Sequence, residues 1–213
     1  YDNLKYEVNK YNYIVAFRFS DEINNIATGR IVQEIQNMPF IGIITINPNK
    51  IKPKLNMLEF LKALMLQQLI RLLGFHIYIE DEEDNIIFEG IIQENEPDEE
   101  EEKIYYLTEE FNEKVFEYVR NYFNCEELPD DFIIKLDLDE DGNVYWPKRY
   151  FLGEIMTKLD YPEEQVLSGF TLAFLEDTTY IRVVKSYTGG LMRFGKNKGC
   201  EFINTEEKCG DYL

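Results

Sequence analysis

The longest uninterrupted apolar stretch of the chain covers residues 55–76 and reads LNMLEFLKALMLQQLIRLLGFH. At about 100° per residue, its Leu, Met, Phe and Ile side chains fall on nearly every side of a helix. The pattern therefore predicts a helix that is buried all round. Asn56 stands three residues before Glu59, which is capping-box spacing and predicts the start of this helix. Gly74 predicts its end.

The few polar residues of this helix are informative, because burying them costs free energy unless they find partners. By the same helix arithmetic, Gln67, Gln68 and Arg71 form one polar stripe in its second half, just ahead of Gly74. The rest of the chain has to explain why a buried helix carries this stripe.

Two strands are predicted ahead of the helix. Residues 13–19, YIVAFRF, are β-branched and aromatic, and residues 40–46, FIGIITI, lie between Pro39 and Pro48. Residues 23–37 are ambiguous between a loop and an irregular strand.

The second half of the chain predicts shorter elements. Thr108 is suited to begin a helix of residues 108–123, whose Phe, Val and Tyr positions recur at helical spacing. Further along, we expect a strand at 132–138, a short helix or turn at 150–158, an apolar helix at 168–176 and a strand at 180–184.

The composition limits the classes of function. With 213 residues and 45% hydrophobic content, the chain can bury a sizeable core in one large domain or two small ones. The net charge of −19 argues against nucleic acid and against an anionic membrane surface. Part of the acidity is the block ENEPDEEEE at residues 94–102, which we interpret as a solvated loop. A weak cation site or a site for a basic partner is the alternative for this block.

Targeting signals and membrane spans are not recognised in the sequence. We find no signal peptide and no apolar run long enough to cross a membrane. The chain does not begin with Met, and we interpret it as a piece of a longer protein. Its three cysteines, Cys125, Cys200 and Cys209, lie in polar or turn-rich contexts that favour disulfides, so one of them would need a partner outside the chain.

Residues 137–142, DLDEDG, are similar to the opening of a calcium-binding loop. The Glu that closes such a loop would fall at Lys148, so the pattern fails at that position. A turn at Asp141–Gly142 is the preferred interpretation, and a calcium site is the alternative.

Six segments, in the correct order, resemble the leishmanolysin-type surface metallopeptidases, a family of zinc-dependent metzincins. The central helix keeps Leu73-Gly74-Phe75 of the family's H-E-x-x-H-x-L-G-F, and Glu154-Ile155-Met156 resembles the Met-turn. The other four are PFIGIITINPNKI at 39–51, VYWPKR at 144–149, FTLAFLEDTTY at 170–180 and RFGKNKGCEF at 193–202.

The resemblance implies an α+β, zincin-like fold, in which a mixed sheet packs on the buried central helix. Together with the pattern of the chain, it predicts an N-terminal subdomain at 1–75 whose central helix spans 56–74. An acidic insertion or loop follows at 76–108. A smaller, mostly helical and irregular C-terminal subdomain at 109–213 contains Met156 and continues beyond the chain end.

The resemblance also implies where the zinc site would stand. Gln67 falls at the first His, Gln68 at the general base, Arg71 at the second His and Tyr145 at the third. Zinc needs good nitrogen, sulfur or carboxylate ligands, whereas Gln is a poor one and Arg is a permanent cation. We therefore expect no zinc, no other cofactor and no catalytic residue. Arg71 is expected either to fill the site, donating to Gln67 and Tyr145, or to extend into an open cleft.

The cysteines follow the same resemblance. It implies a disulfide between Cys125 and Cys200, with Cys209 paired to a Cys outside the chain, and hence a secreted or cell-surface protein.

The function that the resemblance predicts is that of a catalytically inactive pseudopeptidase. It would act as a structural, adhesive or partner-binding scaffold in a cell-surface or extracellular assembly of other proteins. One alternative is a peptide-binding module that takes an extended chain beside residues 40–46, expected to form an edge strand. A further alternative is an active zinc metalloendopeptidase with unusual ligands.

Overall fold

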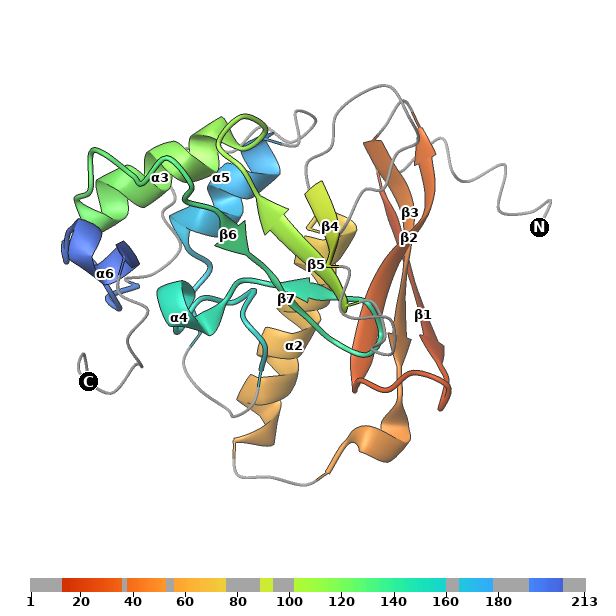
Figure 1. Ribbon diagram of the computed structural model, residues 1–213. Coiled ribbons are helices and arrows are strands. Elements are labelled where there is room, and N and C mark those ends of the chain that lie inside the picture. The colour runs from red at the N-terminus through yellow and green to blue at the C-terminus, as the bar shows by residue number, and fades with distance from the viewer. Residues whose placement is uncertain are drawn as a thin grey trace. The chain divides into compact units, whose positions relative to one another are not determined.

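The computed structural model describes residues 13–35, 38–52, 56–75, 89–93, 102–159, 165–177 and 192–204 (Figure 1). Helices and strands occur together in it, and the fold is α+β with a mixed sheet. The chain divides into two compact units, residues 1–76 and residues 77–213. The predicted strand at 180–184, most of the acidic block and Cys209 lie outside the described residues.

The first unit contains a three-stranded sheet. Its strands are β1 (Ile14–Phe19), β2 (Ala27–Ile35) and β3 (Met38–Ile46), in the order β1-β3-β2. β3 is parallel to β1 and antiparallel to β2, so the sheet is mixed. The short 3₁₀ helix η2 (Pro48–Lys50) follows β3, and the Asn47 side chain caps it by accepting from the Asn49 backbone N–H at 3.0 Å.

The position of β3 corrects the expectation that residues 40–46 form an edge strand. Ile44, for example, pairs with Phe17 on one side and with Gly29 on the other. The ambiguous residues 23–37 supply the second partner, because they form β2. The register of β2 shifts between Ile31 and Glu34, and this bulge breaks the alternation that would have identified a strand from the sequence.

α2 (Met57–Leu72) is the predicted central helix, and it lies against β2 and β3 (Figure 1). It ends where expected, since Gly74 has a φ of 122° that favours glycine. The predicted capping box is wrong. Asn56 lies in the left-handed region with a φ of 59°, and its side chain makes no capping hydrogen bond.

The prediction that this helix is buried all round is also wrong. Three leucines on one side of α2, and Leu73 directly after it, are 40% to 65% exposed, whereas the polar stripe of the helix is buried. The sheet lies along one side of the helix, and a sequence that is apolar all round cannot show which side that is. The exposed leucines are Leu58, Leu66, Leu69 and Leu73.

The described residues of the second unit form two small antiparallel sheets. One has the order β4 (Glu89–Gln93), β5 (Glu102–Leu107) and β6 (Ile134–Lys135). The other pairs β7 (Asp137–Leu138) with β8 (Val144–Tyr145). The expected strand at 132–138 is thus two short strands, and the β5–β6 ladder joins residues on both sides of the expected boundary at 108.

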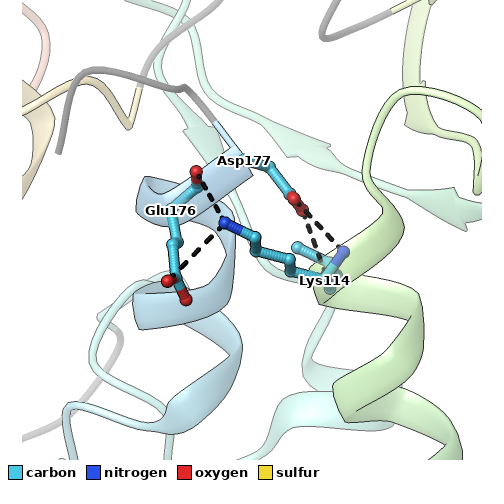
Figure 2. Close-up of polar contacts among 4 residues, drawn as sticks. Lys114, Glu176 and Asp177 are labelled. Atoms are coloured by element: carbon cyan, nitrogen blue, oxygen red, sulfur yellow. Dashed lines mark hydrogen bonds and ion pairs between the residues drawn. The ribbon is translucent and has the colours of Figure 1, made fainter. Parts of the chain in front are cut away.

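α3 (Glu113–Phe123) and α5 (Gly169–Asp177) pack against each other. The expected start at Thr108 is wrong, because residues 109–111 form a turn. A distant residue caps α3 instead. The Asp177 carboxylate accepts from the backbone N–H groups of Lys114 at 3.2 Å and Val115 at 3.1 Å (Figure 2). Lys114 Nζ in turn reaches the backbone carbonyl of Glu176 at 3.5 Å.

A disulfide joins Cys125, just after α3, to Cys200, the first residue of α6 (Cys200–Asn204). This is the pairing that the resemblance implied. The short helix α4 (Lys148–Phe151) contributes Phe151 to an aromatic core between these elements. Edge-to-face and stacked ring contacts connect Tyr118, Tyr122, Phe123, Phe151, Phe170 and Phe202.

Candidate functional site

The polar stripe of α2 is the candidate site of the first unit. Gln67 and Gln68 are 1% exposed and Arg71 is 2% exposed. Because Gln67 and Arg71 are four residues apart on one helix, their side chains lie on the same face. The structure therefore brings these three predicted residues together, and it buries all of them.

Gln68, at the position that the resemblance gives to a general base, has a structural role. Its Oε1 accepts a hydrogen bond of 2.8 Å from the backbone N–H of Gly29 in β2. A Cβ on Gly29 would lie 2.9 Å from the Gln68 backbone carbonyl oxygen, so this close approach of helix and strand requires glycine. Gln68 thus ties α2 to the sheet and satisfies a buried backbone donor.

Gln67 and Arg71 define the electrostatics of the stripe. Arg71 carries a permanent positive charge at 2% exposure, and its guanidinium can only donate hydrogen bonds. Gln67 offers a neutral amide oxygen one turn earlier. A buried cation at this place repels a divalent metal, so these side chains do not fit zinc.

Tyr145, the fourth predicted site residue, lies in β8 of the second unit and is buried. Its hydroxyl donates to Asp139 Oδ2 at 2.7 Å. Because α2 belongs to the first unit, the expected hydrogen bond between Arg71 and Tyr145 stays a prediction.

Asp139 organises the turn that the sequence places at Asp141–Gly142. Its carboxylate accepts from the backbone N–H groups of Asp141 at 3.0 Å and Asn143 at 2.8 Å, and from Asn143 Nδ2 at 2.9 Å. Gly142 has a φ of 76°, and its N–H donates to the Asp139 carbonyl at 3.0 Å, so the predicted turn is confirmed. N–H and O–H donors surround this carboxylate, as suits a turn rather than a calcium loop.

Met156 of the Met-turn-like segment is fully buried. Its backbone carbonyl accepts from the Trp146 N–H at 2.9 Å, and Trp146 forms a β-bridge with Thr157. The segment is therefore held beside the VYWPKR stretch by backbone contacts within the second unit.

Glu154 is a residue whose role the sequence analysis missed. It is completely buried, and its carboxylate accepts hydrogen bonds from Thr171 Oγ1 at 2.5 Å, Ser168 Oγ at 3.0 Å and Ser168 N at 3.2 Å. The Met156 backbone N–H also donates to it. Burial raises the pKa of Glu154 to about 7, while these hydrogen bonds hold that pKa down. The signal available in the sequence was a single acidic residue inside the apolar stretch FLGEIM.

The Glu154 network extends to Trp146, whose Nε1 donates to Thr171 Oγ1 at 2.9 Å. All of its side chains are buried. A carboxylate sealed in this way cannot reach a substrate in solution, and its donors fix the 152–157 turn to the start of α5. The network is therefore a structural centre of the second unit.

Metal ligands and membrane spans are considered for the described part of the chain. Among these residues, no group of three or more His, Cys, Asp or Glu side chains is arranged to hold a metal ion. No helix among them is long and apolar enough to cross a membrane.

Comparison with known proteins gives no assignment. No protein-family model and no curated protein sequence matches the chain. What the protein does has to be argued from its own residues.

Proposed function

We propose that the protein is a catalytically inactive, leishmanolysin-like pseudopeptidase that acts as a partner-binding scaffold. The observation that carries this proposal is the hydrogen bond from the Gly29 backbone N–H to Gln68. At the position where the resemblance expects a general base, the side chain holds a helix to a strand.

The other residues of the stripe support the same proposal. A metallopeptidase site needs two imidazoles on one helix face and a carboxylate beside them. Gln67 and Arg71 have the spacing of the imidazoles, but a buried amide and a buried guanidinium supply neither a metal ligand nor a base. In this proposal, the helix keeps the spacing of the site positions but lacks the side chains that would bind zinc or act as a base.

The second unit supplies the parts that suit a stable scaffold. The Cys125–Cys200 disulfide fixes α6 to the end of α3, and the Glu154 network fixes α5 to the Met156 segment. A disulfide of this kind fits an oxidising compartment, which supports a secreted or cell-surface protein with other proteins as partners. The net charge of −19 makes nucleic acid an unsuitable partner.

A cleavage assay tests the proposal. The full chain is supplied with excess zinc and a mixture of unstructured peptides, and products are identified by mass spectrometry. We expect no cleavage, and the same result for Gln67→Ala, which removes a would-be ligand. Zinc-dependent cleavage that disappears in Gln67→Ala would show an active peptidase and contradict the proposal.

A further inference from the structure

Glu154 is a completely buried acid that has no cation paired with it. Among the described residues, no Lys or Arg forms an ion pair with its carboxylate. Burial without a counter-charge disfavours the ionised form, while hydrogen bonds from Thr171, Ser168 and the Met156 backbone favour it. These two effects oppose each other, and the pKa of Glu154 lies at about 7. The carboxyl group therefore changes its protonation close to neutral pH.

The hydrogen bonds around Glu154 run in one direction. Trp146 Nε1 donates to Thr171 Oγ1 at 2.9 Å, and the Phe170 backbone N–H donates to Ser168 Oγ at 3.2 Å. Each hydroxyl has a single proton and donates it to Glu154 Oε1, at 2.5 Å from Thr171 and 3.0 Å from Ser168. Backbone N–H groups supply the other two hydrogen bonds. In this arrangement Glu154 only accepts, which is the pattern of an ionised carboxylate.

Protonation of Glu154 requires one of these hydrogen bonds to reverse. The carboxyl group then carries a proton that it has to donate, and the backbone N–H groups of Met156 and Ser168 cannot accept it. A hydroxyl oxygen can, and Thr171 Oγ1 makes the shorter hydroxyl contact. It would accept from both Glu154 and Trp146, and its own proton would turn to a backbone carbonyl of the preceding helical turn. One proton is taken up from water, and no other group changes its charge.

The other ionisable groups on the surrounding elements have partners of their own. Tyr118 packs against Gly169 at the start of α5, and burial raises the pKa of Tyr118, so it stays neutral near pH 7. The charged residues of α4, of the end of α5 and of the chain after the Met156 segment are engaged away from Glu154. Arg149 lies over the Tyr150 ring, Lys148 and Lys158 lower the pKa of Asp137, and Glu176 and Asp177 contact Lys114.

The net charge of the second unit acts on Glu154 in the same direction as burial. Residues 77–213 contain 13 Lys and Arg and 35 Asp and Glu, a net charge of −22, whereas residues 1–76 contain nine and six, a net charge of +3. A strongly negative unit disfavours a further negative charge in its interior. The protonated form of Glu154 is favoured accordingly.

We propose that Glu154, Thr171 and Trp146 form a proton-operated switch in the second unit. Protonation of Glu154 reverses its hydrogen bond with Thr171 and weakens the hydrogen bond from Trp146 to the same hydroxyl oxygen. In the ionised state, the carboxylate polarises the Thr171 hydroxyl, which makes Oγ1 a stronger acceptor for the indole N–H. In the protonated state, Oγ1 accepts from two donors at once. The contact between Trp146 and α5 therefore depends on pH, and the inference does not rest on the proposed function.

The chain contains one Trp, so the indole N–H of Trp146 gives a single signal in the NMR spectrum of the full, isotope-labelled chain. We expect its proton resonance to move downfield as the pH rises, with a midpoint near pH 7, because its hydrogen bond becomes stronger. Infrared spectra over the same pH range follow the C=O stretch of protonated Glu154, which is identified by its absence from Glu154→Gln. This band should disappear with the same midpoint.

Two matched variants test the part played by Thr171. Thr171→Val removes the hydroxyl that accepts from Trp146, and Ser168→Ala removes a hydroxyl that donates to the same Glu154 oxygen but accepts from Phe170. Each loss of a donor raises the midpoint of the Glu154 band by about half a pH unit or more. The indole signal still follows that band in Ser168→Ala, whereas in Thr171→Val it no longer does. Circular dichroism checks that both variants are folded.

Glu154→Gln is the control for other titrating groups. Its side chain has the shape of the protonated carboxyl group and no charge, so the indole signal should stay constant across the pH range. The variant retains His76, which lies outside the described residues and whose ordinary pKa is also near neutral. An indole signal that moves equally in Glu154→Gln would therefore come from His76 or another group.

Three outcomes overturn the inference. They are a wild-type indole signal that is constant or moves upfield as the pH rises from about 5 to 9, a signal that moves equally in Glu154→Gln, and a Thr171→Val signal that still follows the Glu154 band. The first two do not require Thr171→Val to fold, so an unstable variant does not protect the inference. None of these measurements involves peptide cleavage, so a failure here is distinguished from a failure of the proposed inactivity.

Discussion

At the scale of single residues, buried polar side chains hold neighbouring elements together. Gln68 is almost completely buried and Glu154 is completely buried. A side-chain oxygen of each accepts a hydrogen bond from a residue of another element. A buried polar group without partners would cost more than a typical hydrogen bond contributes. Each of these side chains therefore fixes the elements around it, Gln68 in the first unit and Glu154 in the second.

Glu154 gives the protein a pH-dependent stability. Its pKa in the folded protein, about 7, is above the ordinary value of 4.5, so the folded chain holds this proton more tightly than the unfolded chain. The stabilising contribution is fully present below the unfolded pKa and is lost as the pH rises through the folded pKa. The difference between the two pKa values corresponds to about 3 kcal/mol in the free energy of unfolding. Burial also raises the pKa of Asp137 and Asp177, which shift stability in the same direction.

A comparison with Glu154→Gln isolates this contribution. The free energy of unfolding is measured in urea at several pH values between the ordinary and the raised pKa, for the wild type and the variant. Gln mimics the protonated carboxyl, so the wild type should lose stability relative to the variant as the pH rises. Parallel pH profiles would show that Glu154 does not titrate as described.

At the scale of elements, the sequence identifies helices and strands better than their caps and neighbours. α2 lies within the predicted 56–74, and β1 and β3 match predicted strands, because hydrophobic periodicity is a local signal. The start of α3 could not be found locally, since its cap is Asp177, 62 residues beyond Val115. Whether β3 is an edge or a central strand depends on β2, whose bulge hides its pattern.

For the candidate site as well, the local pattern could be predicted from the sequence but the distant contacts could not. Helix arithmetic placed Gln67, Gln68 and Arg71 in one polar stripe, and the structure buries all three side chains. That Gly29 would be the partner of Gln68 could not be predicted, because the two are 39 residues apart and their contact depends on how helix and sheet pack.

The contact between α2 and β2 can be tested by Gln68→Ala. The variant leaves the buried Gly29 N–H without its acceptor, and we expect a loss of about 1–3 kcal/mol in the free energy of unfolding. Hydrogen exchange at the Gly29 amide should become faster. Leu69→Ala, which truncates an exposed neighbour, is the control and should change stability less. Equal losses for the two variants would mean that the hydrogen bond contributes nothing specific.

At the scale of the whole molecule, the predicted site residues are divided between two units of opposite net charge. Gln67, Gln68 and Arg71 belong to the unit with a net charge of +3, and Tyr145 belongs to the unit with a net charge of −22. The central claim of the proposed function is that these four residues stand where a leishmanolysin-like peptidase would have its zinc ligands and general base.

Reversing the four substitutions tests that claim most directly. Zinc per chain is measured by mass spectrometry of metals after dialysis, for the wild type and for a variant with Gln67→His, Gln68→Glu, Arg71→His and Tyr145→His. A three-substitution variant that keeps Tyr145 is the control, and it should bind zinc more weakly because one ligand is missing. The account predicts no zinc in the wild type and one zinc per chain in the folded four-substitution variant. Stoichiometric zinc in the wild type, or none in the folded variant, would contradict it.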